Sequence, residues 1–126
     1  MAKHPKKPSE ADNIKACKDW LSANGFLWVR VNNQRMVRDK GGGFKHIPID
    51  PNQVGCPDII AWNGDYRLEA VFGPPEFCMC YAIEVKSWRG TQQDSQKEWQ
   101  AKARKYGIKY CVVKSVEDLQ KQLIDR

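Results

Sequence analysis

The spacing of apolar residues near the start of the chain predicts an amphipathic helix. Ile14, Cys17 and Leu21 recur at intervals of three and four residues, so they share one face of a helix. Ser9 stands ahead of them as a typical N-cap residue. The pattern stops at an Asn-Gly pair, which is typical of a helix end. We therefore predict a helix over residues 10–23.

Several later segments are rich in aromatic and β-branched residues and are separated by turn residues, which is typical of strands. The predicted strands cover residues 26–31, 44–49, 57–62, 66–71, 78–85 and 108–113. Three consecutive glycines, 41–43, predict a turn before the second of these strands. The pair Asn63-Gly64 predicts a tight hairpin turn, with 66–71 as its return strand.

Two more helices are predicted in the C-terminal part of the chain. The first covers residues 92–106 and ends before Gly107. The second begins after Ser115, an N-cap residue, and carries Leu119 and Leu123 one turn apart. This order of elements predicts an α/β fold: a mixed sheet, with an antiparallel meander and one βαβ unit, flanked by helices.

Length and composition add a charge argument to this picture. The chain has 126 residues, the size of one domain, and a net charge of +6. Residues 1–8 are rich in Lys and Pro and are predicted to form a flexible basic arm ahead of a single domain, 9–126. A basic excess favours a polyanionic partner such as nucleic acid, although many small proteins are basic without one.

The same composition bears on the compartment. Neither a membrane-spanning apolar run nor a signal peptide is found in the sequence. Five cysteines are an odd number, which argues against a complete disulfide framework. We therefore expect a cytoplasmic protein with free thiols. The cysteines and histidines lack zinc-finger spacing, so a structural zinc site is not expected.

Two charged residues interrupt the most convincing strand, 78–85. Alternation along a strand puts Glu84 and Lys86 on the same face, in a segment that should be central in the sheet. Buried charges are costly unless they are paired or bind a metal. One interpretation is a structural Glu–Lys ion pair, and the other is a functional site.

A third charged residue opens an apolar strand. Pro57-Asp58 precedes this strand, where Pro and Asp alone indicate no more than a turn. Two carboxylates from neighbouring strands, Asp58 and Glu84, can however hold Mg²⁺, which prefers oxygen ligands. Such an ion polarises a scissile phosphate and activates water. Lys86 can orient that water or offset the charge that develops on the phosphate.

These residues resemble the PD-(D/E)xK nuclease pattern. The residues around them are similar to the VRR-NUC branch, the virus-type replication–repair nucleases, and the resemblance covers residues 9–119. The matching residues, in order, are Gly55, Pro57, Asp58, Ile83, Glu84, Val85, Lys86, Gly90, Gln96 and Trp99. One departure is the long segment between Asp58 and Glu84, where many such nucleases have a tighter hairpin.

The resemblance implies a restriction-endonuclease-like core, in the order α-β-β-β-α-β with a C-terminal helix, and a DNA nuclease that uses Mg²⁺ or Mn²⁺. Its metal ligands would be Asp58, Glu84 and the backbone carbonyl of Val85, with Glu10 contributing through a water. Gln96 would contact phosphate or water in the active site, although a solvated helix position is the alternative.

Glu10 also has an interpretation that rests on the helix pattern alone. It shares a face with the apolar stripe of the 10–23 helix and is predicted to point toward the sheet. The alternative is a carboxylate that is simply favourable at a helix N-terminus.

Basic residues gather around the first two predicted strands and the loop between them. They are Arg30, Arg35, Arg38, Lys40 and Lys45. Such side chains typically bind phosphate rather than read bases, so we predict that they bind DNA. Arg30 stands among apolar strand residues and is expected to approach the active site.

The resemblance also implies a partner and a source. It suggests a phage-type homodimer, in the cytoplasm of a bacterial host, that acts on branched, flapped or four-way-junction DNA in replication, repair or recombination. Phe72 and Phe77, in the 64–77 segment, are candidates for the dimer contact. The alternative is a non-catalytic DNA-binding module on a nuclease fold. An RNA-binding protein is disfavoured, because RRM and KH motifs are absent from the sequence.

Overall fold

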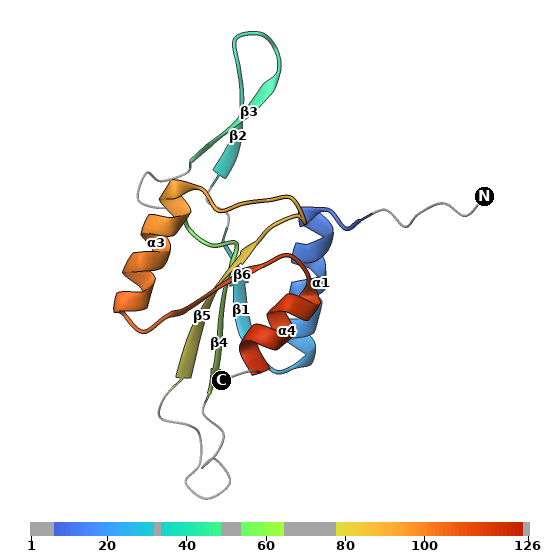
Figure 1. Cartoon of the computed structure of the whole chain (residues 1–126). Helices are drawn as coiled ribbons and strands as arrows, with labels where there is room; N and C mark the ends of the chain where they lie inside the picture. Colours follow the sequence, from blue (N-terminus) through green and yellow to red (C-terminus); the bar gives the residue numbers. More distant parts are fainter. Residues whose placement is uncertain (1–6, 32–33, 49–53, 65–77, 125–126) are drawn as a thin grey trace, which may run out of the picture.

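The computed structural model describes residues 7–31, 34–48, 54–64 and 78–124. Its elements, in chain order, are α1 (Glu10–Ala23), β1 (Leu27–Arg30), β2 (Gln34–Arg38), β3 (Phe44–Pro48), β4 (Ile59–Gly64), β5 (Cys78–Val85), α3 (Asp94–Lys105), β6 (Lys109–Val113) and α4 (Val116–Ile124). The prediction of an α/β fold is confirmed, with a mixed sheet flanked by helices (Figure 1).

The main sheet has four strands in the order β1-β4-β5-β6. The pairs β1–β4 and β4–β5 are antiparallel, whereas β5 and β6 are parallel and joined by α3. The predicted antiparallel strands and βαβ unit are therefore both present. Two parallel strands need a crossover connection, because the chain must return to the end of the sheet at which β5 began before β6 can start.

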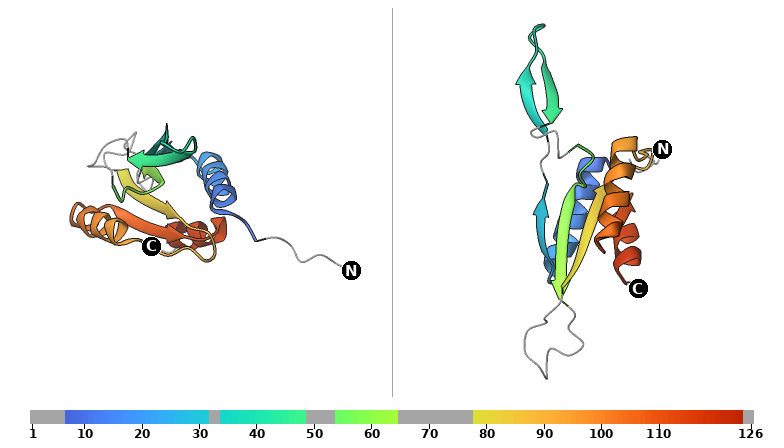
Figure 2. Two further views of the ribbon diagram at one scale, coloured as in Figure 1. Left: turned by 90° about the horizontal axis from the view of Figure 1, so that it is seen from above. Right: turned by 90° about the vertical axis from the view of Figure 1, so that its left-hand side faces the viewer.

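A two-stranded hairpin, β2–β3, is inserted between β1 and β4 and forms a sheet of its own. Figures 1 and 2 show that it projects beyond one end of the main sheet. The sequence analysis predicted β3 and the glycine turn but no strand over Gln34–Arg38. Asp39 holds the turn, since its Oδ1 accepts hydrogen bonds from the backbone N–H groups of Gly41 (2.8 Å) and Gly43 (3.2 Å).

The first helix has the predicted bounds, and local contacts explain where it starts. The Oγ of Ser9 accepts a hydrogen bond from the N–H of Asp12, whose carboxylate accepts one from the N–H of Ser9 (both 3.1 Å). This reciprocal capping satisfies two backbone donors that a helix N-terminus leaves without partners. The helix start is therefore set by four consecutive residues.

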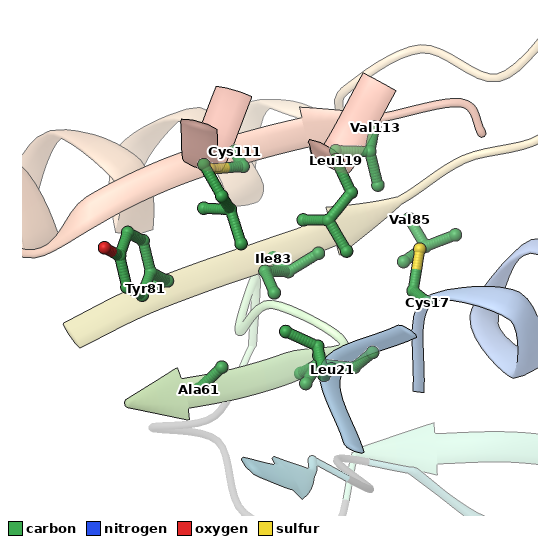
Figure 3. Close-up of a cluster of buried hydrophobic side chains, with 11 residues drawn as sticks. Cys17, Leu21, Ala61, Tyr81, Ile83, Val85, Cys111, Val113 and Leu119 are labelled. Atoms are coloured by element: carbon green, nitrogen blue, oxygen red, sulfur yellow. The ribbon is translucent and has the colours of Figure 1, made fainter. Parts of the chain in front are cut away.

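Alternation along β5 divides the core into two layers. One face carries Tyr81, Ile83 and Val85, which pack with α1 and α4, including Leu21 and Leu119 (Figure 3). A fully buried leucine contributes about 1.5–3 kcal/mol to folding. The other face of β5 packs against α3. The residues of this second cluster include Ala82, Ala103 and Tyr110, with Trp99 against them. Glu84 belongs to this second face.

The predicted turn at Asn63-Gly64 is wrong. Both residues continue β4 and pair with Met79 and Cys78, because β5 extends far enough to keep the ladder going. The predicted return strand 66–71, together with Phe72 and Phe77, lies outside the described residues.

The described part of the chain holds no helix long and apolar enough to cross a membrane. All five cysteines are free thiols.

Candidate active site

The β4–β5 ladder brings Asp58 and Glu84 to one end of the sheet. Ile59, the first residue of β4, lies opposite Ile83 of β5. The N–H of Asp58 donates to the carbonyl oxygen of Ile83 (3.0 Å), and its Oδ2 accepts from the N–H of Val85 (2.7 Å). The carboxylate of Asp58 is therefore fixed against the backbone on either side of Glu84. Two residues 26 positions apart in sequence become neighbours through strand pairing.

Glu84 is a buried carboxylate with three side-chain partners. It is only 2% exposed. Its Oε1 accepts a hydrogen bond from Nε2 of Gln96 (2.7 Å) and lies 3.3 Å from Nζ of Lys86. Its Oε2 lies 3.4 Å from the hydroxyl of Tyr110. The Glu–Lys contact of the structural interpretation is thus present, and the functional interpretation stays a prediction that this contact does not exclude.

Gln96 connects the start of α3 to this cluster. Its Oε1 accepts from the backbone N–H of Gln93 (2.8 Å), which forms part of a capping box at the helix N-terminus, and from Nζ of Lys86 (2.9 Å). Because the side-chain oxygen is occupied by two donors, the amide nitrogen is turned toward Glu84. The structure therefore brings together Asp58, Glu84, Lys86 and Gln96, which the sequence analysis had selected.

A glycine allows the loop before Asp58 to pack on α3. Gly55 has φ +84°, and a Cβ there would lie 2.2 Å from the backbone oxygen of Ser95. A side chain at this position is excluded twice, by the backbone conformation and by the contact. Gly55 thus holds the loop that carries Asp58 directly against the helix that carries Gln96.

We expect Gly55→Ala to lower the free energy of unfolding by more than about 2 kcal/mol, because the backbone contact cannot relax as a flexible side chain would. Gly107→Ala is the matched control. Gly107 has a similar φ of +80°, but nothing lies within 4 Å of a Cβ there. Urea denaturation of both variants measures the difference. Equal losses would show that the contact with Ser95 costs nothing beyond the backbone strain.

A buried asparagine that the sequence analysis did not select supports Lys86. Asn13 is 4% exposed, and its Nδ2 donates to the carbonyl oxygens of Lys86 (3.1 Å) and Lys114 (2.9 Å). It thereby ties the ends of β5 and β6 together, beside the hydrogen bond from Lys86 N–H to Val113 (2.8 Å). The sequence did hold a signal for Asn13: it is a polar residue one turn before Cys17, on the apolar face of the helix.

Glu10 is exposed, so the prediction that it points toward the sheet is wrong. The buried row of α1 consists of Asn13, Cys17 and Leu21 and starts one turn later. Glu10 lies in the first turn, beside the capping residue Ser9, which is exposed as well. A contribution of Glu10 through a water stays a prediction.

Arg30 lies at the site from the β1 side. Its Nη1 donates to the carbonyl oxygens of Val31 (2.7 Å) and Asp58 (2.9 Å) and lies 3.5 Å from Oδ1 of Asp58. Its side chain is 40% exposed, so it retains donors that face solvent. Arg30 therefore adds positive charge at the edge of the carboxylate pair.

The surroundings of Glu84 disfavour its negative charge. Burial, followed by the charge of Asp58, raises the pKa of Glu84 from 4.5 to about 8, and Lys86 offsets only part of this rise. Burial and the charge of Glu84 also raise the pKa of Tyr110. A second positive charge beside the carboxylates would favour the ionised form of Glu84.

The donors present fit a hard divalent cation. Asp58 and Glu84 offer only oxygen, and the longer contacts of Asp58 Oδ1 (3.5 Å) and Glu84 Oε2 (3.4 Å) allow these atoms to take a cation without losing a strong hydrogen bond. No group of three or more His, Cys, Asp or Glu side chains suited to a metal occurs among the described residues. Mg²⁺ needs only one or two carboxylates, since it keeps several waters.

The other basic residues of interest lie on the β2–β3 hairpin. Arg38, Lys40 and Lys45 are exposed there. Arg35 belongs to β2, but its side chain is outside the described part. The hairpin leaves the main sheet after Arg30, at the end that also carries Asp58, because these strand ends pair with each other.

Comparisons of the chain with protein-family models, with curated proteins and with solved structures found no match. Function is therefore inferred from the residues of the site, their contacts and the motif resemblance.

Proposed function

We propose that the protein is a metal-dependent DNA nuclease with a PD-(D/E)xK core of the VRR-NUC type. The observation that carries this proposal is the cluster at the end of β4 and β5. Of the four residues that recur in that motif, Glu84, Lys86 and Gln96 are joined by contacts of 2.7–3.3 Å. The carboxylate of the fourth, Asp58, accepts a hydrogen bond from the backbone N–H of Val85, the residue next to Glu84 (2.7 Å). When the separate β2–β3 hairpin is set aside, the elements of the main domain follow the order αβββαβ, which also fits other α/β proteins. The cluster therefore carries more of the proposal than the topology does.

In this proposal, Asp58 and Glu84 hold Mg²⁺ or Mn²⁺, with the Val85 carbonyl as a further oxygen ligand. The ion supplies Lewis-acid polarisation of the scissile phosphate and activation of water. The protein contributes fixed ligands: the N–H of Val85 holds one oxygen of Asp58, and Gln96 holds one oxygen of Glu84. Ligands held in this way need little reorganisation when substrate binds.

Lys86 is positioned for transition-state stabilisation. Its ammonium has three N–H donors, of which one faces Glu84 and one is donated to Gln96. The described residues offer no partner for the third, which can be donated to a phosphate oxygen or to the attacking water. Hydrolysis adds negative charge to the phosphate in the transition state, and a preorganised cation at that point lowers the barrier.

The basic hairpin β2–β3 is proposed to grip the DNA outside the active site. A two-stranded β-ribbon fits the major groove of B-form DNA, and exposed Arg and Lys on it neutralise phosphates. Asp39 keeps its negative charge while its carboxylate accepts hydrogen bonds within the turn, so the three exposed cations Arg38, Lys40 and Lys45 outnumber it on the hairpin.

We expect Arg35→Ala and Arg38→Ala to weaken DNA binding and to reduce the steepness of its salt dependence by about one phosphate contact each. Fluorescence anisotropy in EDTA at several salt concentrations measures both quantities. Lys121→Ala, an exposed lysine of α4 away from the hairpin, is the control. Unchanged affinity and slope in the two arginine variants would remove the hairpin from the DNA-binding surface.

A homodimer acting on branched DNA is part of the same proposal. A four-way junction presents two symmetric strands, which two symmetric active sites match. The segment considered for the dimer contact lies outside the described residues, so this part rests on the motif resemblance. Analytical ultracentrifugation with and without a four-way junction tests it.

The function is tested by incubating labelled four-way junction, linear duplex and single-stranded DNA with the protein in Mg²⁺, Mn²⁺ or EDTA. Metal-dependent cleavage of the junction supports the proposed nuclease and its structure selectivity. Equal cleavage of all three substrates keeps the chemistry and discards the selectivity. Binding without cleavage of any DNA would instead favour the non-catalytic DNA-binding module.

A further inference from the structure

The turn that follows Lys86 carries an exposed aromatic side chain, Trp88. The carbonyl oxygen of Ser87 accepts a hydrogen bond from the N–H of Gly90 (2.9 Å), which closes a four-residue turn with Trp88 and Arg89 at its centre. A Cβ at Gly90 would lie 3.0 Å from the Cβ of Lys86, so this turn folds back onto the Lys86 stem. Trp88 lies two residues after the lysine of the proposed catalytic cluster, in a turn that packs against the side chain of that lysine.

Trp88 is 44% exposed, and basic side chains gather around it. Nζ of Lys7 lies 3.8 Å from its ring centroid, and the guanidinium carbon of Arg89 lies 4.3 Å from it. Nζ of Lys114 donates to the carbonyl oxygen of Trp88 (3.2 Å). Among the residues that the structure describes, none of these three cations forms an ion pair with a carboxylate.

A structural role alone does not explain this arrangement well. Cation–π contacts at an exposed site are weak, and they bring like charges together at the surface. Among the described residues this cluster has no carboxylate paired with its cations, and the indole is in contact with like-charged groups that an anion with a flat base can displace. A nucleotide supplies both, because its base is a flat apolar surface and its phosphate is an anion.

We propose that Trp88 is a stacking platform for an unpaired base of the DNA, and that Lys7, Arg89 and Lys114 bind the phosphates beside that base. The base takes the place of the Lys7 ammonium on the indole, and that ammonium is then free to pair with phosphate. This inference rests on the proposed nuclease function in one respect only: the strand that carries the stacked base is taken to be cut close to that base.

The inference narrows the substrate class. An interior base of an intact duplex has both faces covered by its neighbours, so it cannot stack on Trp88 unless it is unpaired or flipped out at an energetic cost. DNA with a single-stranded segment next to the cut presents such a base without this cost. The platform therefore favours a junction between paired and unpaired DNA over a continuous duplex.

The test measures binding in EDTA, so that it does not depend on cleavage. The probes are a fluorescein-labelled oligothymidylate and a blunt-ended duplex of equal charge. We expect Trp88→Ala to weaken binding of the oligothymidylate roughly tenfold and binding of the duplex much less, and Trp88→Phe to retain most of the affinity. Tyr106→Ala is the matched control, since Tyr106 is an aromatic side chain that is 85% exposed at the C-terminal end of α3.

Intrinsic fluorescence gives a second measurement, because stacking of a base on an indole quenches its emission. The oligothymidylate should quench wild-type emission more than that of Trp88→Phe, and the difference is the contribution of Trp88. Lys7→Ala should lower the salt dependence of oligothymidylate binding.

Three results would overturn the platform: equal oligothymidylate affinity in wild type and Trp88→Ala, equal weakening of both probes, or equal quenching in wild type and Trp88→Phe. Failure of the nuclease proposal looks different. Wild-type protein that cleaves no DNA in Mn²⁺, while Trp88→Ala still loses affinity for the oligothymidylate, would contradict the nuclease and support the platform.

Discussion

Replacing Lys86 with alanine is expected to lower metal-dependent DNA cleavage by roughly 100- to 1000-fold, the usual cost of removing one preorganised charge stabiliser. The reason is local. The ammonium is held between Glu84 and Gln96, with one donor left for substrate, and the described residues place no other lysine within hydrogen-bond reach of Glu84. The rate of single-turnover cleavage in Mn²⁺ measures the loss.

The stem of Lys86 also supports the turn at Gly90, so alanine can disturb structure as well as charge. Lys86→Met keeps most of the stem and removes only the ammonium, and it should lose activity to the same extent. Lys15→Ala is the control for charge alone, because Lys15 pairs with Asp19 on the exposed side of α1. A single-turnover cleavage rate of Lys86→Met within threefold of the wild-type rate would contradict the proposed role of the Lys86 ammonium.

The second large effect is a link between pH, metal and stability at Glu84. A carboxyl group whose pKa is raised in the folded protein does not lower the free energy of unfolding while it is protonated in both the folded and the unfolded state. The cost appears as pH rises through its unfolded value and is complete above its folded value. For Glu84, with a folded pKa of about 8, stability in EDTA should therefore fall between about pH 4.5 and pH 8, by at most about 5 kcal/mol.

Glu84→Gln should remove most of this fall, since glutamine does not ionise and still offers an oxygen to Gln96 and Lys86. It should therefore be more stable than wild type at pH 8.5 in EDTA and not at pH 5. Glu98→Gln is the control, because Glu98 is an exposed carboxylate of the same helix, α3. Chemical denaturation across this pH range measures all three proteins.

Mg²⁺ or Mn²⁺ should reverse the loss in the wild type, because a bound cation favours ionised Glu84 and stabilises the folded state that binds it. The stabilisation should be larger at pH 8.5 than at pH 5.5 and should be nearly absent in Glu84→Gln. Equal stabilisation by the metal in wild type and variant would mean that Glu84 is not a ligand.

Local signals in the sequence determined a large part of the fold. The capping residues Ser9 and Asp12 set the start of α1, and alternation in β5 separated Ile83 from Glu84 on opposite faces. Both signals act within a few residues, where the backbone geometry of helix or strand is enough to assign a face. The choice of Asp58, Glu84, Lys86 and Gln96 also came from their order in the chain.

Contacts between distant segments were decided only by the tertiary structure. The turn expected at Asn63-Gly64 depends on how far β5 extends, and the sequence does not carry the length of a ladder. Glu10 has the spacing of the helical stripe, yet it is exposed, and the buried row of α1 begins at Asn13. Asn13 became a support of Lys86 because its amide meets two strand ends 73 and 101 residues away.

The proposed platform at Trp88 also depends on contacts between residues that are distant in the sequence. Its neighbours Lys7 and Lys114 are far apart in the sequence, and only folding brings the first to the indole ring and the second to the backbone carbonyl of Trp88. The sequence by itself thus determined most of the elements, the faces of β5 and the chemical types at the site, whereas it missed β2. The tertiary structure decided the hydrogen-bond partners, the burial and the shifted pKa of Glu84, because these depend on through-space distances that chain order does not specify.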